Sequence, residues 1–453
     1  MDIIAAISTA QTATAIGIVR VSGEGCFDLC DKVFHAVNGK AFSVQENRKM
    51  VFGEMLDDHG RIIDRGLAVR FSAPHTYTGE DIVEFNCHGS PVVLRELLGA
   101  LFAAGARQAT AGEFTRRAFL NGKLDLTEAE AVIDLIDAET PAAARNAAAQ
   151  LDGALRRLLS PVQESLLEIT SRFYAVVDYP DEDIEDIRPE EIASALGEAE
   201  TALTRLLGTA QRGKILKSGI RTAIVGRPNA GKSSLLNALA GYDRAIVTDI
   251  PGTTRDTVEE SVLCGGVQLR LIDTAGIRET EDAVEKLGVE RSRAAMDSAQ
   301  LVLAVVDGAQ GLTKEDEALL NIAAQSEKWV LILSKKDLSP AAYSGPLTPD
   351  AIVSLSSLTG EGLDELENVI TRLFPPGTAA DAGTLLTDAR QEDAARRAAA
   401  AIRRAKEALE AGFTPDAILT DAEEALEAVG ELTGRTAKEE IVSRIFSRFC
   451  VGK

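Results

Sequence analysis

Hydrophobic and polar positions change their spacing along the chain, and the first segment mixes two periods. Short β-type runs such as 16–21 and 82–85 alternate with turn residues, whereas residues 91–104 have helical spacing. This mixture predicts an α+β domain over residues 1–119.

From about residue 124 the apolar positions follow a helical period in an Ala- and Leu-rich composition. The pattern runs through 142–159, 162–177 and 189–207. It predicts the first half of an all-α domain over residues 120–214. The same composition returns near the C-terminus and predicts the second half over residues 379–453.

Between these halves, apolar runs alternate with helical stretches. The runs at 223–225, 267–272, 301–306 and 330–333 are continuous rather than alternating, which is typical of buried parallel strands. The pattern predicts an α/β domain over residues 215–378, inserted into the helical domain.

Composition narrows the function classes. The 453 residues carry a formal net charge of −22, and residues 121–214 alone contribute −10. This charge argues against a protein that coats nucleic acid by bulk attraction, because phosphate neutralisation needs Lys and Arg. The five cysteines lack C-x-x-C spacing, and no leader or 18-residue apolar run occurs, so we expect a soluble cytoplasmic protein without disulfides or zinc.

A phosphate-binding loop stands out at residues 226–233. Its sequence GRPNAGKS matches G-x-x-x-x-G-K-[ST], follows a predicted strand and opens a predicted helix. Its glycines let backbone N–H groups surround phosphate, Lys232 can reach the β- and γ-phosphates, and the Ser233 hydroxyl can bind Mg²⁺.

Three further stretches follow in the order that a GTPase requires. Thr253 or Thr254 in GTTRD can complete the Mg²⁺ shell, and Asp273 in DTAG can hold Mg²⁺ through water. In SKKD (334–337), the Asp337 carboxylate can accept two hydrogen bonds from guanine, which adenine does not offer. Ser356 and Ser357 suit the last base-contacting loop.

Departures from the usual GTPase pattern are informative. Ser334 replaces the Asn that braces the base loop, so we expect guanine selectivity with weaker affinity. Ile277 occupies the position of the water-orienting Gln in Ras-like proteins. Nearby polar residues that could orient water instead are Arg278, Glu279, Glu281, Asp282 and Glu285. Asn229 is either a solvated turn residue or a ligand for a monovalent cation.

Long stretches of this chain resemble the MnmE (TrmE) family of tRNA-modification GTPases. The resemblance spans nearly the whole chain, from GIVRVSG to the terminal FCVGK. The stretches that carry it are 17–23, 77–89, 112–138, 178–184, 226–241, 245–256, 273–292 and 449–453.

For the N-terminal domain, the resemblance implies a fold similar to folate-binding aminomethyltransferase-like domains. It also implies homodimerisation and binding of 5-formyl- or 5,10-methylene-tetrahydrofolate. The matching folate positions are Arg20, Glu84, Lys123 and Lys453. Cys450 lies beside them by analogy; a packing role is the simpler interpretation, and a catalytic thiol is the alternative. Residues 11–15 read QTATA, which departs from the glycine- and arginine-rich turn that the family often carries before this strand.

For the G domain, the resemblance implies a potassium-dependent GTPase whose G domains pair on binding GTP. Ser233 and Thr254 match Mg²⁺ ligands, and Glu285 matches the catalytic residue that orients water. Matches to the K⁺ ligands are Asn229, Thr248, Ile250 and Thr253. Matches to GTP-binding residues are Asn229, Ala230, Gly231, Lys232, Ser233, Ser234, Thr248, Asp249, Ile250, Pro251, Gly252, Thr253, Thr254, Asp273, Thr274, Ala275, Gly276, Lys335, Asp337, Ser356 and Ser357.

Two functions follow. In the first, implied by the resemblance, the GTPase works with the FAD-dependent partner MnmG (GidA), which alone holds FAD. Together they place an aminomethyl-type group on C5 of the tRNA wobble uridine, and folate supplies the one-carbon unit. The alternative is an Era-like RNA- or ribosome-assembly GTPase, which has no need of the folate positions. The acidic charge favours tRNA held mainly by the partner or by small basic patches such as Arg116–Arg117.

Overall fold

The computed structural model describes residues 2–178, 188–242, 260–272, 295–339, 342–377 and 381–453. The chain divides into two compact units, each described by itself. One unit comprises residues 1–133, 150–200 and 397–453, and the other comprises 134–149 and 201–396.

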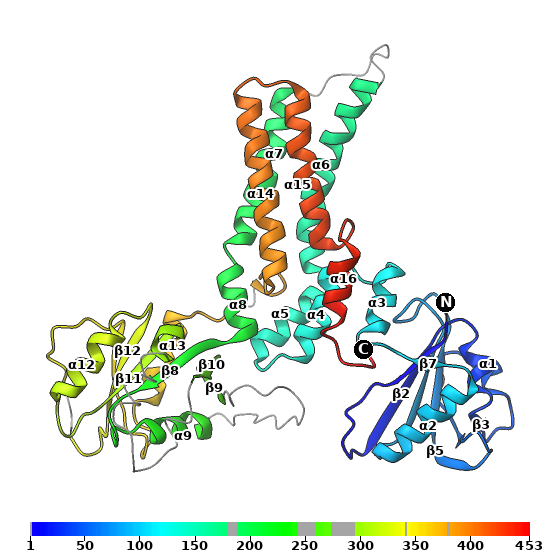
Figure 1. The fold of residues 1–453 in the computed structure, drawn as a ribbon, viewed down its shortest axis with the longest axis horizontal. Coiled ribbons are helices and arrows are strands. Elements are labelled where there is room, and N and C mark those ends of the chain that lie inside the picture. Colours follow the sequence, from blue (N-terminus) through cyan, green and yellow to red (C-terminus); the bar gives the residue numbers. More distant parts are fainter. Residues whose placement is uncertain (1, 179–187, 243–259, 273–294, 340–341, 378–380) are drawn as a thin grey trace. The chain divides into compact units, whose positions relative to one another are not determined.

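The N-terminal segment forms a seven-stranded sheet in the order β3-β4-β5-β6-β2-β1-β7 (Figure 1). Neighbouring strands are antiparallel, except for the parallel pair β1 and β7. The strands are β1 (Ile4–Ile7), β2 (Ile16–Ser22), β3 (Phe34–Ala36), β4 (Val51–Leu56), β5 (Ile62–Phe71), β6 (Ile82–His88) and β7 (Arg107–Gln108).

One face of this sheet packs on α1 (Cys26–Cys30) and α2 (Pro91–Ala104). Val19, Val21 and Phe85 point into that core, and Arg20 and Glu84 alternate with them and therefore lie on the opposite face. The α+β expectation is confirmed, as are the strands at 16–21 and 82–85 and the helix at 91–104. The short helix α3 (Glu113–Leu120) follows β7.

The helical segments come before and after the second sheet in the sequence, and α8 (Ala210–Ser218) extends past residue 214, where the first helical half was expected to end. These segments are α4 (Leu126–Ile136), α5 (Pro141–Leu151), α6 (Ala154–Asp178), α7 (Pro189–Leu207), α8, α14 (Ala389–Glu410), α15 (Pro415–Thr433) and α16 (Glu439–Phe446). Helix α15 lies along α6, and ion pairs of Arg404 with Asp421 and Glu424 join it to α14 (Figure 1).

Helix boundaries differ from the predicted stretches in one place. The stretch 142–159 is interrupted between α5 and α6, because Gly153 adopts a left-handed conformation with φ 81°. In turn, α6 continues through Pro161, which lies inside it. Proline removes one helical hydrogen bond, and here the packing of α6 on its neighbours maintains the helix.

The second sheet has the order β13-β12-β11-β8-β10-β9. Its strands are β8 (Ile220–Val225), β9 (Glu260–Cys264), β10 (Val267–Leu271), β11 (Leu301–Asp307), β12 (Trp329–Ser334) and β13 (Ala351–Ser354). All neighbours are parallel except β9 and β10, and β11 is buried along its whole length, as its continuous apolar run predicts.

Helices cover both faces of this sheet. Helices α9 (Lys232–Tyr242) and α13 (Leu363–Leu373) contribute Leu235 and Leu366 to one core. Helix α12 (Lys314–Ala323) contributes Leu320 to the other. Among the described residues, none of the helices has the length and apolarity to cross a membrane.

Candidate functional sites

The phosphate-binding loop connects β8 to α9 in a geometry that requires glycine and tolerates few alternatives. A Cβ at Gly226 would lie 2.4 Å from the carbonyl oxygen of Val305. Gly231 has φ 103°, and Asn229 adopts a left-handed φ of 63°. Asn229 and Ser233 are exposed. The predicted loop therefore has the strand, turn and helix that phosphate binding needs.

Lys232 closes over this loop. Its Nζ donates to the carbonyl oxygens of Gly226 and Arg227, each at 2.8 Å. Burial lowers the pKa of the ammonium, because a low dielectric penalises its charged form. Two carbonyl oxygens therefore hold a partly desolvated ammonium in place. Phosphate oxygens can bind it, because their negative charge offsets the free-energy cost of its desolvation.

Ser334 braces the phosphate loop from the base-recognition side. Its Oγ lies 2.6 Å from the carbonyl oxygen of Ala230 and 3.1 Å from that of Val306, and the residue is 3% exposed. A hydroxyl has one proton, so the shorter contact is the donated hydrogen bond. Serine thus supplies the brace to the loop that Asn supplies in N-K-x-D.

The two base-recognition loops adjoin each other. The backbone N–H of Lys336 donates to the Leu355 carbonyl at 3.2 Å, which ties the loop after β12 to the loop after β13. Lys335 has φ 60°, and its Nζ lies 2.6 Å from Asp307 Oδ2. Asp337 is exposed beside this point, and Ser356 is buried, with Ser357 next to it.

Much of the predicted GTPase site falls outside the described residues. That part contains the expected catalytic residue Glu285 and most of the expected metal ligands. The residues concerned are Thr248, Asp249, Ile250, Pro251, Gly252, Thr253, Thr254, Asp273, Thr274, Ala275, Gly276 and Glu285.

An ion pair inside the phosphate loop was not expected from the sequence. Arg227 Nε donates to Asp316 Oδ1 at 2.8 Å, and Asp316 also forms a capping box with Thr313 at the start of α12. The T-x-x-D spacing is visible in the sequence and indicates the helix start. Its pairing with Arg227 depends on the sheet order, which brings β8 beside β11.

In the N-terminal sheet, Arg20 and Glu84 are direct neighbours across β2 and β6. Arg20 Nη2 lies 2.8 Å from Glu84 Oε1, and the two side chains are 19% and 21% exposed. The Arg20 Cζ lies 5.6 Å from the ring centres of both Tyr77 and Phe114. A partly exposed ion pair with two aromatic neighbours offers charge and ring surface at one place.

Neither aromatic residue was singled out from the sequence. Tyr77 begins one stretch that resembles the family (77–89), and Phe114 lies within another (112–138). This resemblance is the signal that could have identified them. Burial raises the pKa of Tyr77, and its hydroxyl lies 2.9 Å from Thr115 Oγ1. The phenol therefore stays neutral and packs beside the Arg20 guanidinium.

The C-terminal segment docks onto the same unit. The carbonyl oxygen of Lys453 accepts from the Phe114 N–H at 3.2 Å, and Val451 forms a β-bridge with Ala111. A Cβ at Gly452 would lie 2.2 Å from the Ile7 carbonyl oxygen, so this approach requires glycine. The terminal residue is thereby anchored to the residue whose ring flanks Arg20.

The remaining N-terminal candidates lie close by. Lys123 packs on the loop after Tyr77, since a Cβ at Gly79 would be 3.2 Å from Lys123 Cε. Cys450 is exposed, and its carbonyl oxygen accepts from the Gly112 N–H at 3.4 Å. The packing role considered for the Cys450 side chain is therefore wrong, because burial is what that role requires.

The suggested basic patch at Arg116–Arg117 is also wrong. The Arg117 side chain is 5% exposed and forms ion pairs with Asp2, Glu80 and Glu113. Arg116 pairs with Glu439. Two adjacent arginines in the sequence indicated a basic surface patch. In α3, however, the Arg117 side chain points into the interior, where carboxylates neutralise its charge.

Comparison with known proteins covers the whole chain. The family model for the MnmE helical domain matches residues 126–450, and the model for the GTP-binding protein TrmE N-terminus matches residues 3–123. The tRNA modification GTPase MnmE of Heliobacterium modesticaldum is 44% identical over 465 residues, covering 100% of this chain and 99% of the relative. That of Streptococcus thermophilus is 42% identical over 455 residues, covering 100% and 98%. Among solved structures, Era of Aquifex aeolicus bound to GDP·AlF4− is 29% identical, with a TM-score of 0.27, and covers 40% of this chain and 66% of that one.

Proposed function

Because the chain belongs to the MnmE family of tRNA modification GTPases and is a GTP hydrolase of tRNA modification, we propose that it modifies C5 of the tRNA wobble uridine. It does so with the FAD-dependent partner MnmG in the cytoplasm, and the product is of the aminomethyl or carboxymethylaminomethyl type. The observation that carries the proposal is the Arg20–Glu84 pair beside Tyr77, Phe114 and the docked C-terminus. An Era-like assembly GTPase has no use for such a site.

The chemistry of this N-terminal site suits a tetrahydrofolate. The Glu84 carboxylate can accept hydrogen bonds from the amide-like N–H edge of a pterin, and Tyr77 and Phe114 offer ring surface beside it. Arg20, Lys123 and Lys453 can bind carboxylates of the glutamate tail. The bound 5-formyl or 5,10-methylene derivative supplies a one-carbon unit. The role of this chain is to hold and orient it, and the exposed Cys450 thiol is a candidate for chemistry there.

The N-terminal sheet has one face covered by α2, and exposed apolar side chains on its other face favour a homodimer. Phe52 and Leu67 are directly paired on β4 and β5 and are 51% and 37% exposed, and Ile16 on β2 is 61% exposed. These side chains lie on the same face as Arg20 and Glu84. A second copy covering this face would bury the apolar row and place the folate between subunits.

In the G domain, we infer that GTP binds with Mg²⁺ on Ser233 and Thr254. Asn229 and the carbonyls of Thr248, Ile250 and Thr253 would hold a K⁺ ion, which would supply positive charge opposite the phosphates, and Glu285 would orient water. The left-handed, exposed Asn229 leaves its side chain available for such an ion. GTP hydrolysis measured with Mg²⁺ should be at least tenfold faster in KCl than in NaCl. Equal rates in the two salts would contradict the potassium site.

The direct test is nucleoside analysis of tRNA from cells that lack the gene. Wobble uridines of substrate tRNAs should lose their C5 modification, and the wild-type gene should restore it. A gene carrying Arg20→Leu should fail to restore it although its GTP hydrolysis persists. Modified wobble uridines in the deletion strain, together with ribosome-assembly defects, would favour the Era-like alternative.

A further inference from the structure

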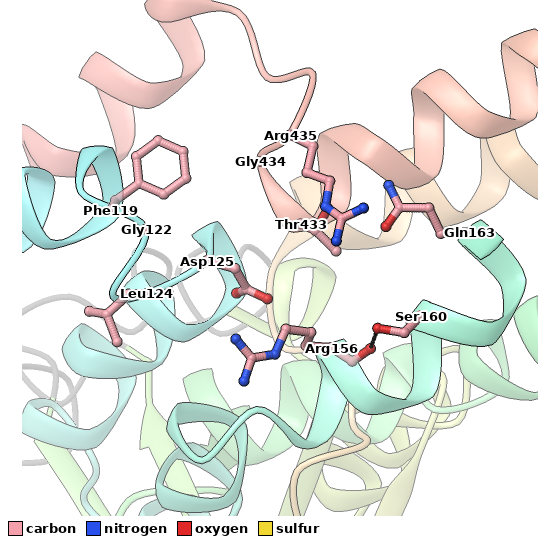
Figure 2. A pocket seen from close by; sticks show the side chains of 10 residues that line it. All are labelled: Phe119, Gly122, Leu124, Asp125, Arg156, Ser160, Gln163, Thr433, Gly434 and Arg435. Carbon is pink, nitrogen blue, oxygen red and sulfur yellow. Dashed lines mark hydrogen bonds between the residues drawn. The ribbon is translucent and has the colours of Figure 1, made fainter. Parts of the chain in front are cut away.

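A pocket of about 310 Å³ lies in the unit that contains the N-terminal domain, and two of its lining residues, Gly122 and Leu124, flank Lys123 of the proposed folate site (Figure 2). Its walls come from the segment before α4, from α6 and from the loop after α15. Phe119, Asp125, Arg156, Gln163, Thr433 and Arg435 line it. This volume is at the lower end for small-molecule sites, so the pocket has room for one ligand group rather than a folded chain or a duplex.

Two guanidinium groups face this pocket from different elements. Arg156 projects from α6 and Arg435 from the loop after α15 (Figure 2). Arg435 is exposed and forms no ion pair with any described residue. Arg156 is 51% exposed and, among the described residues, its guanidinium contacts Glu128 Oε1 at 3.2 Å, which leaves most of its five N–H donors available. Asp125 also lines the pocket, so two guanidinium groups face one carboxylate there and the pocket keeps a net positive charge.

Gln163 adds neutral hydrogen-bonding groups to the pocket wall. The residue is 7% exposed, and its side chain reaches the pocket on the Thr433 and Arg435 side (Figure 2). Because its amide faces the pocket, its two N–H groups can donate to a ligand that enters there.

The surroundings indicate what kind of anion enters. Although the whole chain has a net charge of −22, residues 434–453 carry five basic and two acidic side chains. Lys438, Arg444 and Arg448 are exposed along and beside α16, which directly follows the pocket loop. Of the two acidic residues, Glu439 is paired with Arg116. These basic side chains follow the pocket along the chain, so a polyanion could contact them and the pocket together, whereas a free metabolite would contact the pocket alone.

We propose that this pocket binds a phosphate group of the tRNA, held between Arg156 and Arg435. The Gln163 amide donates to a phosphate oxygen, and Phe119 forms an aromatic wall for the attached ribose or an unstacked base. The inference rests on the proposed function, because it takes tRNA as the partner. The inference places part of the tRNA contact on the helical domain of this chain, in a segment that is basic although the whole chain is acidic.

The test compares tRNA binding by full-length variants, measured by fluorescence anisotropy with a labelled substrate tRNA. Arg435→Gln and Arg156→Gln should each weaken binding about tenfold. Each should also reduce the slope of log affinity against log salt by about one. Arg157→Gln is the matched control: Arg157 is the next residue on α6, does not line the pocket and contacts Asp152, so its affinity should stay within twofold of wild type.

A further variant separates a binding defect from a folding defect. Gln163→Glu keeps the shape of the side chain and can pair with the two arginines, so the fold should survive while tRNA binding falls at least tenfold. GTP hydrolysis should be unchanged in all variants, since none lies in the GTP site. If all three pocket variants bind tRNA like Arg157→Gln, the inference is overturned.

Three outcomes distinguish the alternatives. AMP binding is measured by calorimetry on wild type and on the pocket variants; if the variants lose it while their tRNA affinity is unchanged, the pocket is a site for a free nucleotide and the tRNA assignment is overturned. If wild-type protein and its partner leave wobble uridine unmodified, the proposed function fails irrespective of the pocket. If they modify it and the pocket variants bind tRNA normally, this inference alone fails.

Discussion

The phosphate loop and the Arg20–Glu84 site both offer positive charge to an anionic ligand, but they are built in opposite ways. The phosphate loop is one run of eight residues, 226–233, whose backbone geometry is set by Gly226, Asn229 and Gly231. The N-terminal site is assembled from two strands, a loop, α3 and the C-terminus, which are far apart in the sequence. The first is local and the second depends on the tertiary fold.

This difference determines which substitutions disrupt each site. Truncating the side chains of Lys232 or Ser233 leaves the backbone of the phosphate loop in place, so the effect is confined to the bound nucleotide. In the N-terminal site, Arg20 and Glu84 stabilise each other, and removing one leaves a partly buried charge unpaired. The two sites also lie in different compact units. Variants in one should therefore spare the binding chemistry of the other.

The largest effect that separates the two regions is expected for Lys232→Ala. It removes the ammonium that bonds Gly226 and Arg227, and GTP hydrolysis should fall at least about 100-fold, because this charge faces the phosphates that react. Folate binding, measured by calorimetry, should be unchanged. Lys328→Ala, which removes a half-exposed lysine of the same unit paired with Asp350, is the control and should hydrolyse GTP normally. A parallel loss of folate binding would show that the sites are not separable.

The reciprocal variant is Arg20→Leu. Folate affinity should fall about ten- to 100-fold, because Glu84 loses its partner and the ligand loses a guanidinium. GTP hydrolysis should remain at the wild-type rate. Arg61→Leu is the control, since Arg61 lies in the turn between β4 and β5, is 77% exposed and pairs with Asp57. Equal folate affinities of the two variants would remove Arg20 from the site.

The local site was predictable from the sequence in a way that the assembled site was not. A spacing rule identifies Lys232 and Ser233, because strand, turn and helix follow one another along the chain. No spacing rule relates Arg20 to Glu84, because their contact is a consequence of β2–β6 pairing, and only the family resemblance indicated both. Tyr77 and Phe114 were missed for the same reason.

Two errors have different physical origins. The adjacent pair Arg116–Arg117 predicted a basic patch, but helical spacing directs Arg117 toward Glu113 and the buried carboxylates around it. The helix break at Gly153 is local: the glycine adopts φ 81°, whereas the prediction followed the apolar period, which continues through it. Neighbours in space decide the first case, and the backbone conformation of one residue decides the second.

The smallest effect concerns Ser334, where the base loop meets the phosphate loop. Ser334→Ala removes the hydrogen bond to the Ala230 carbonyl, and a single neutral hydrogen bond of this kind is worth about 0.5–1.5 kcal/mol. GTP affinity measured by fluorescent-nucleotide titration should therefore fall about two- to tenfold, while guanine selectivity, which depends on Asp337, is retained. Ser218→Ala is the matched control, because the exposed Ser218 hydroxyl donates to the Lys214 carbonyl of its own helix. If both variants bind GTP equally well, the brace contributes nothing to the nucleotide site, and the phosphate loop is as self-contained as its sequence suggests.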